Sequence, residues 1–376
     1  MTTVHSKILA LRSSLQAAFC ERDREIDSLL IAALAREHIL LLGPPGTAKS
    51  ELARAFSGAI QGASHFEWLL SKFSTPEELF GPVSLSALKA DRFTRVTTGK
   101  LPEAHTAFLD EIFKANSAVL NSLLAVINER VFHNNGSPVS VPLLTCVGAS
   151  NELPESAELG ALWDRFLLRH WVDYVASPDS FATIVSGSSS LRSSATITLD
   201  EWDQARAEVL GVALPQAVID ALWRLRSELA PEGIVASDRR WRKCAALLRA
   251  AAWLDGLSEV SVEHLSVLSA ALWNVPDQAP KVAAACARFA SAELADAQRA
   301  YDGLVEVLQK LPQASDPAFE AKAPAARREL AKGVAKLRNL QNKAAPASAR
   351  KIQALIVDLQ GRSAELRDAV ARMLDL

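Results

Sequence analysis

Residues 43–50 read Gly43-Pro44-Pro45-Gly46-Thr47-Ala48-Lys49-Ser50, directly after the short apolar run His38-Ile-Leu-Leu-Leu42. A run of this length suits a buried parallel strand, and the spacing from Ala48 to Ile60 predicts a helix after the turn. A glycine-rich turn at the positive end of a helix lets backbone N–H groups converge on phosphate. In this pattern Lys49 reaches the β- and γ-phosphates, and the Ser50 hydroxyl binds Mg²⁺. The stretch therefore predicts a loop that binds ATP or GTP; the alternative is an ordinary glycine-proline turn before a helix.

One residue departs from the usual phosphate-loop pattern. That pattern has glycine immediately before the lysine, and this sequence has Ala48. The loop must therefore accommodate a methyl group at this position.

A second apolar run, from Thr106 to Leu109, ends in Asp110 and Glu111. Two acids that close a strand are commonly solvated or capping groups. Because a phosphate loop lies about sixty residues upstream, we instead expect these acids to belong to the nucleotide site. Asp110 would hold the hydration shell of Mg²⁺, and Glu111 would orient and deprotonate the attacking water.

Four further residues are candidates for the same site. Asn151 follows the strand predicted from Val141 to Ala149, where its amide would sense the γ-phosphate or serve only as a turn residue. Arg165 is a candidate arginine finger that acts on a neighbouring subunit, or a surface arginine. Arg239 and Arg240 follow a predicted helix cap, and either could reach a nucleotide or lie exposed in the first helical turn.

Strand and helix signals alternate over the first half of the chain, which predicts an α/β fold with a parallel sheet between helices. The Asn-Gly turn at 135–136 predicts a hairpin, and Phe93 to Thr97 predicts one arm of another. Beyond a polar stretch at 186–194 the signals are helical, with caps expected at Thr198 and Ser237. We expect an αβα core at 1–185, an all-α lid at 186–275 and a C-terminal domain of long helices at 276–376.

The C-terminal helices carry an excess of positive charge. Residues 321–376 contain twelve Lys/Arg and five Asp/Glu, a net charge of +7 in a chain whose total is −2. Such a tail suits an acidic partner, nucleic acid or an anionic membrane surface, and equally a solvated helix face. Proline residues are expected to divide this region into two or three long helices at Pro312, Pro317, Pro324 and Pro346.

Composition predicts a cytoplasmic protein. The four cysteines have no C-x-x-C pair and no Cys/His ligand spacing, so we expect reduced thiols. No apolar run approaches the roughly 18 residues of a membrane span. The N-terminal residues lack the apolar region and cleavage site of a signal peptide.

The motifs GPPGTAKS, FLDE, GASNELPE and LWDRF occur in the order typical of MoxR-family AAA+ ATPases, and the sequence resembles that family. The resemblance covers roughly residues 1–275. It is closer still to the regulatory-ATPase-variant-A (RavA) branch through KFSTPEELFGP, GKLPEAHTAFLDEIFKAN, LLAVINER and SDRRW. In that branch alanine commonly precedes the lysine, which accounts for Ala48.

The resemblance implies a chaperone-like remodelling ATPase that forms a hexameric ring with ATP and Mg²⁺ at the subunit interfaces. Lys49 and Ser50 map onto Walker A, Asp110 and Glu111 onto Walker B, Asn151 onto sensor 1 and Arg165 onto the arginine finger. Arg239 or Arg240 maps onto sensor 2. Residues 80–99 and 130–142 resemble the helix-2 insert and the pre-sensor-1 hairpin.

The family usually acts with a von Willebrand factor A (vWA) domain protein on a protein client, so we expect both partners. In the best-studied branch, a small β-rich domain recruits a partner. The C-terminal hundred residues of this sequence predict helices and show no pattern for such a domain. Two alternatives are a nucleotide-switched scaffold with incidental turnover and a nucleic-acid motor. The sequence lacks a helix-turn-helix, a zinc finger and an aromatic-interleaved basic strip, which argues against the latter.

Overall fold

The computed structural model describes residues 2–154, 157–187, 193–290, 292–309, 311–312, 317–344 and 346–373. Most of the polar stretch predicted as a linker, residues 188–192, lies outside them. The chain forms two compact units. The first comprises Met1–Pro215, Ala236–Val260 and Ala270–Leu272, and the second comprises Gln216–Val235, Ser261–Ser269 and Trp273–Leu376.

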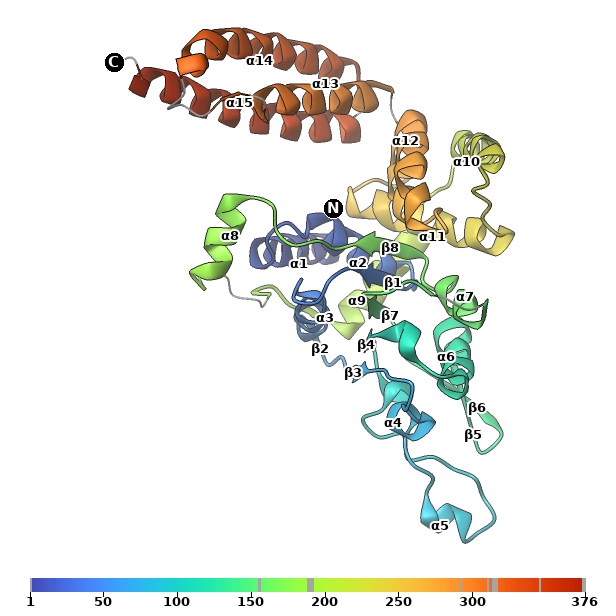
Figure 1. The fold of residues 1–376 in the computed structure, drawn as a ribbon. Coiled ribbons are helices and arrows are strands. Elements are labelled where there is room, and N and C mark those ends of the chain that lie inside the picture. The colour runs from blue at the N-terminus through green and yellow to red at the C-terminus, as the bar shows by residue number, and fades with distance from the viewer. Residues whose placement is uncertain are drawn as a thin grey trace. The chain divides into compact units, whose positions relative to one another are not determined.

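A five-stranded parallel sheet forms the centre of the first unit, in the order β3–β4–β7–β1–β8 (Figure 1). Its strands are β1 (Ile39–Leu42), β3 (His65–Leu69), β4 (Thr106–Asp110), β7 (Thr145–Ser150) and β8 (Leu168–Trp171). All residues of β1 and β7 are buried, as expected for central strands covered on both faces. Because the strands are parallel, the residues that follow β1, β4 and β7 meet at one edge of the sheet.

Helices flank this sheet, and α2 and α3 pack directly on its strands. The longer helices of the unit are α1 (Thr3–Ala18), α2 (Asp23–Leu34), α3 (Lys49–Gly58), α6 (Ser117–Glu129), α7 (Ala157–Trp163), α8 (Pro178–Val185), α9 (Leu199–Leu210) and α11 (Asp238–Leu254). The predicted caps are confirmed: the Thr198 hydroxyl accepts from Glu201 N–H, and the Ser237 hydroxyl accepts from Arg240 N–H. A short parallel pair, β2 (Ile60–Gln61) and β9 (Ile197–Thr198), joins distant segments.

Two segments project from the sheet and are joined to each other (Figure 1). One carries α4 (Pro76–Phe80) and α5 (Leu85–Leu88), and the other is the predicted hairpin, β5 (Val131–Asn134) and β6 (Ser137–Ser140). Arg95 N–H donates to the Asn134 side-chain oxygen at 2.8 Å, and the Asn134 amide donates back to the Arg95 carbonyl at 3.2 Å. The hairpin arm predicted at 93–97 is wrong: one bridge forms, between Val83 and Arg95. Pro82 has no N–H to continue the ladder.

The second unit is helical. It contains α10 (Gln216–Leu229), α12 (Ala279–Ala290), α13 (Ala292–Gln309), α14 (Pro317–Lys343) and α15 (Pro346–Met373), with 3₁₀ turns at Ala230–Glu232, Val262–Ala270 and Pro276–Gln278. Helices α13, α14 and α15 lie side by side (Figure 1) around a shared core that includes Leu330, Leu337, Ile352 and Ile356. Pro317 and Pro346 begin helices, where proline is tolerated.

The predicted break at Pro324 is wrong, because this proline lies inside α14. It costs the helix one backbone hydrogen bond, and the proline itself is exposed. None of the described helices is long and apolar enough to cross a membrane. The two units confirm the predicted α/β core followed by helical regions.

Candidate functional site

The predicted phosphate loop connects β1 to α3 and has an unusual backbone. Gly43, Gly46 and Ala48 have positive φ angles of 136°, 78° and 62°. A Cβ on Gly43 would lie 2.2 Å from the Val172 carbonyl oxygen, so only glycine fits there. Ala48 adopts the left-handed conformation at the N-cap of α3, which costs an L-residue roughly 1–2 kcal/mol. The loop therefore accommodates the methyl group at the expense of local strain.

Ala48→Gly is expected to raise the free energy of unfolding by about 1 kcal/mol, because glycine adopts positive φ without a steric penalty. Gly46→Ala is the matched opposite change. Its added Cβ would meet nothing within 4 Å, so a loss of about 1 kcal/mol would come from the backbone alone. Urea denaturation of the wild type and the two variants measures both changes in the free energy of unfolding. Equal stability of Ala48→Gly and wild type would show that Ala48 carries no strain.

Lys49 and Ser50 occupy the first turn of α3. The Lys49 ammonium donates to the carbonyl oxygens of Gly43 and Pro44, at 2.9 and 2.7 Å, and to the Thr47 hydroxyl at 3.1 Å. Burial lowers the pKa of Lys49, and the nearby Asp110 and Glu111 oppose that effect. The Ser50 hydroxyl donates to the Glu51 carboxylate at 3.0 Å. Lys49 thus lies against the loop, with its charge close to both acids.

The structure places the ends of three strands around one cavity of about 180 Å³. Its lining combines the loop with the predicted acids and amide: Gly43, Pro45, Gly46, Thr47, Ala48, Lys49, Ser50, Glu51, Phe108, Asp110, Glu111, Ser150 and Asn151. Asp110 accepts the Glu111 backbone N–H at 2.9 Å. One Glu111 carboxylate oxygen, Oε2, is buried without a hydrogen-bond partner in the described part of the chain and lies 3.4 Å from Lys114 Nζ.

This donor set fits a magnesium nucleotide. The loop turns around Gly43 and Gly46, as anion binding by backbone N–H groups requires. Ser50 and Asp110 bring a hydroxyl and a carboxylate to the same cavity, the hard oxygen ligands that Mg²⁺ takes beside phosphate and water. Among the described residues no group of three or more His, Cys, Asp or Glu forms a separate metal site. The cavity can hold phosphate, metal and a water beside Glu111.

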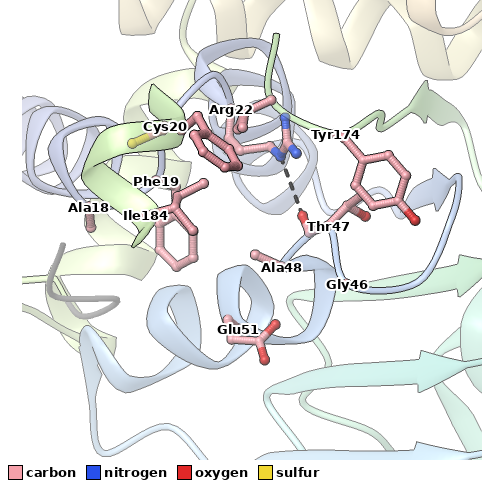
Figure 2. Close-up of a pocket in the computed structure, with 12 residues that line it drawn as sticks. Ala18, Phe19, Cys20, Arg22, Gly46, Thr47, Ala48, Glu51, Tyr174 and Ile184 are labelled. Carbon is pink, nitrogen blue, oxygen red and sulfur yellow. Dashed lines mark hydrogen bonds between the residues drawn. The ribbon is translucent and has the colours of Figure 1, made fainter. Parts of the chain in front are cut away.

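A second cavity, of about 610 Å³, adjoins the same loop and was not predicted from the sequence (Figure 2). The two cavities share Gly46, Thr47, Ala48 and Glu51. The remaining wall is largely apolar and comes from three segments: Ala18, Phe19, Cys20, Arg22, Tyr174, Val175, Phe181 and Ile184. Arg22 Nε donates to the Thr47 carbonyl at 3.4 Å, which ties the wall to the loop. A cavity of this size and character suits the base of a nucleotide.

The three predicted arginines do not line either cavity. They gather instead around Asp164, which follows α7. Arg165 and Arg239 lie 3.7 and 3.8 Å from its carboxylate, and Arg240 donates directly to it. The Arg240 side chain is 5% exposed and that of Arg239 is 48% exposed. Burial and the nearby Arg239 lower the pKa of Arg165. The three arginines thus form ion pairs with Asp164 outside both cavities.

Comparison with known proteins identifies the family. A family model for the MoxR domain in the MoxR-vWA-beta-propeller ternary systems matches residues 6–207. The chain belongs to the MoxR family of AAA+ ATPases. A model of an AAA lid domain matches residues 217–285. The family therefore accounts for both the nucleotide-binding core and part of the helical unit.

Similar proteins span both close and distant relatives of this MoxR-family chain. An uncharacterised protein of Methanocaldococcus jannaschii is 42% identical over 72% of this chain and 73% of its own length. Protein MoxR of Paracoccus denitrificans is 29% identical over 46% of this chain and 52% of its own. A crystal structure from Cytophaga hutchinsonii, of a protein provisionally assigned as an ATPase, has a TM-score of 0.57. It is 17% identical and covers 74% of this chain and 85% of its own, which supports the fold alone.

Proposed function

We propose that this MoxR-family protein hydrolyses ATP and uses the energy to remodel a protein client. The observation that carries the proposal is the single cavity lined by Lys49, Ser50, Asp110, Glu111 and Asn151. These residues come from three separate strand ends, and together they supply the charge, metal ligands and base that phosphoryl transfer to water needs.

Each residue has a distinct proposed role. The backbone N–H groups of residues 43–50 hold the phosphates, and Lys49 leaves its contacts with the loop carbonyls to pair with the β- and γ-phosphates. Ser50 and Asp110 hold Mg²⁺, which neutralises charge on the phosphates when bound. Glu111 orients the attacking water and accepts its proton, and Asn151 contacts the γ-phosphate. Catalysis then depends mainly on positioning and electrostatics.

Arg165 is proposed to complete the site of a neighbouring subunit in a hexameric ring. Its place beside Asp164, outside the cavity of its own chain, supports a role in trans. Arg239 is the better candidate for a sensor 2 residue, since it is half-exposed. Arg240 is buried against Asp164 and so is better suited to holding that loop. We assign the core to 1–185, the lid to 186–275 and a C-terminal domain to 276–376.

A vWA domain protein is the proposed partner, because the matching family model describes MoxR domains from systems that contain one. The motifs quoted above support placement in the RavA branch. The described parts of α12 to α15 and the turns between them contain no strand, so a partner bound through a β-rich insert is not carried over. The four free cysteines support a cytoplasmic location.

Helix α14 presents a positively charged outer face. Arg328, Lys332, Lys336 and Lys343 recur at helical spacing, and each is exposed. None of these four forms an ion pair with a described residue. An anionic membrane surface is a candidate contact for this face. Liposome pelleting that shows no dependence on anionic lipid would eliminate it.

Ser50→Ala is expected to raise the Mg²⁺ concentration for half-maximal ATP turnover about tenfold, because the variant loses one of the two proposed protein ligands to the metal. Ser122→Ala is the matched control, since Ser122 is a half-exposed residue of α6 that lines neither cavity and donates to the Ala118 carbonyl. Phosphate release measured across a Mg²⁺ titration compares the two. An unchanged titration curve for Ser50→Ala would contradict the proposed metal site.

A further inference from the structure

Glu21 connects the N-terminal helices to a segment 155 residues later. Its carboxylate oxygens accept the backbone N–H groups of Ala176 at 2.8 Å and Ser177 at 2.9 Å. Ser177 is the N-cap of α8. The two hydrogen bonds lower the pKa of Glu21 to about 2 although the side chain is exposed, so the carboxylate is charged at neutral pH. Charge-assisted bonds of this kind are the stronger class of hydrogen bond.

Arg22, the next residue, binds the same segment and the phosphate loop together. Its guanidinium donates to the Asp173 carbonyl at 2.6 Å and to the Thr47 carbonyl at 3.4 Å. The side chain is buried. Arg22 and Glu21 therefore hold the two ends of the segment 173–177. Arg22 also contacts the loop that is proposed to bind phosphate.

Helix α8 has little packing of its own. None of its residues is buried, although Phe181 and Ile184 line the 610 Å³ cavity. These two side chains are 62% and 52% exposed. A short helix without buried residues takes its position from its termini and their hydrogen bonds. The contacts at Ala176 and Ser177 hold the N-terminal end of α8 beside the cavity.

We propose that Glu21 is a positioning residue for the nucleotide base. By holding the start of α8, it places Phe181 and Ile184 as the outer wall of the cavity beside the phosphate loop. The inference rests on the proposed function in taking the ligand to be ATP. Glu21 lines neither cavity, so it acts through α8 and not by touching the ligand.

This arrangement separates the base from the phosphates. Loss of the Glu21 contacts releases the wall that encloses the base, while Lys49, Ser50 and the loop amides keep their places. A ligand with a base therefore loses affinity, and a ligand made only of phosphates does not. Turnover at saturating ATP is unchanged, since Glu111 and Asp110 lie in the other cavity. The effect appears in KM and not in kcat.

The test compares ATP with inorganic tripolyphosphate in the full-length Glu111→Gln protein, which removes turnover from the measurement. Glu21→Gln keeps the size of the side chain but loses its charge and one acceptor oxygen. We expect its Kd for ATP to rise about tenfold and its Kd for tripolyphosphate to stay within about twofold. Glu21→Ala should show a larger rise for ATP alone. Glu259→Gln, an exposed change in the same unit, is the control.

Amide hydrogen exchange provides a second measurement that needs no nucleotide. Residues 176–185 should exchange faster in Glu21→Gln than in Glu259→Gln. The role of Glu21 would be overturned if the binding of ATP and of tripolyphosphate weakened equally. Unchanged amide hydrogen exchange at residues 176–185 would also overturn it. A protein that binds ATP with the expected Glu21 dependence, but shows no turnover with Glu111 intact, would instead overturn the proposed hydrolysis. The two failures are therefore distinguishable.

Discussion

Glu111→Gln is expected to lower steady-state ATP turnover about a thousandfold and to leave ATP binding intact. Glutamine preserves the shape of the side chain but cannot accept a proton from water. Glu111 lines the cavity that holds Lys49 and Asp110, and its Oε2 has no hydrogen-bond partner among the described residues. The same oxygen lies 3.4 Å from Lys114 Nζ, so the proposed role requires the attacking water to take the place of this contact.

Phosphate release at saturating ATP, combined with equilibrium ATP binding, checks this expectation. Glu103→Gln is the matched control, because Glu103 lies outside both cavities and its side chain accepts from Thr97. Turnover retained in Glu111→Gln would show that another group serves as base. Loss of binding together with turnover would show that the glutamate holds the nucleotide.

Arg165→Ala is expected to lower turnover at least about a thousandfold, the effect of removing an arginine finger. Mixing this variant with Glu111→Gln should restore activity. In a randomly mixed ring, about a quarter of the interfaces pair an intact Glu111 with an intact Arg165 from the next subunit. Each protein alone has no such interface, so recovery to about a quarter of wild-type activity reports catalysis in trans.

Arg288→Ala is the control for this experiment, since Arg288 is an exposed arginine of α12 that pairs with Glu228. Size-exclusion chromatography with light scattering establishes that each variant still assembles. Activity that stays absent in the mixture of assembled variants would place Arg165 in the site of its own chain. Unchanged turnover of Arg165→Ala would remove it from catalysis.

Local signals made much of the fold and of the phosphate cavity predictable. Residues 43–48 lie between a strand and a helix that are both evident in the sequence, and Asp110 ends another strand. Parallel strands place their carboxyl ends at the same edge of the sheet. The position of the cavity could therefore be predicted from short stretches of sequence. The caps at Thr198 and Ser237 were predictable for the same reason.

Contacts between distant segments were not predictable. The bond from Ser177 N–H to Glu21 spans 156 residues, and neither residue belongs to a recognised motif. The pairing of Arg240 with Asp164 likewise depends on how α11 packs in the first unit. Pro324 shows the limit of a local rule: proline disfavours a helix, but packing of α14 along Leu330 and Leu337 outweighs one lost hydrogen bond.

The paired hydrogen bonds between Arg95 and Asn134 have a mechanical consequence. Two bonds in opposite directions oppose both sliding and separation, so we expect the α4–α5 segment and the β5–β6 hairpin to move together. Asn116, five residues after Glu111, donates to the Ser74 carbonyl at 2.7 Å. The start of the α4–α5 segment is therefore tied to the stretch of chain that follows Glu111.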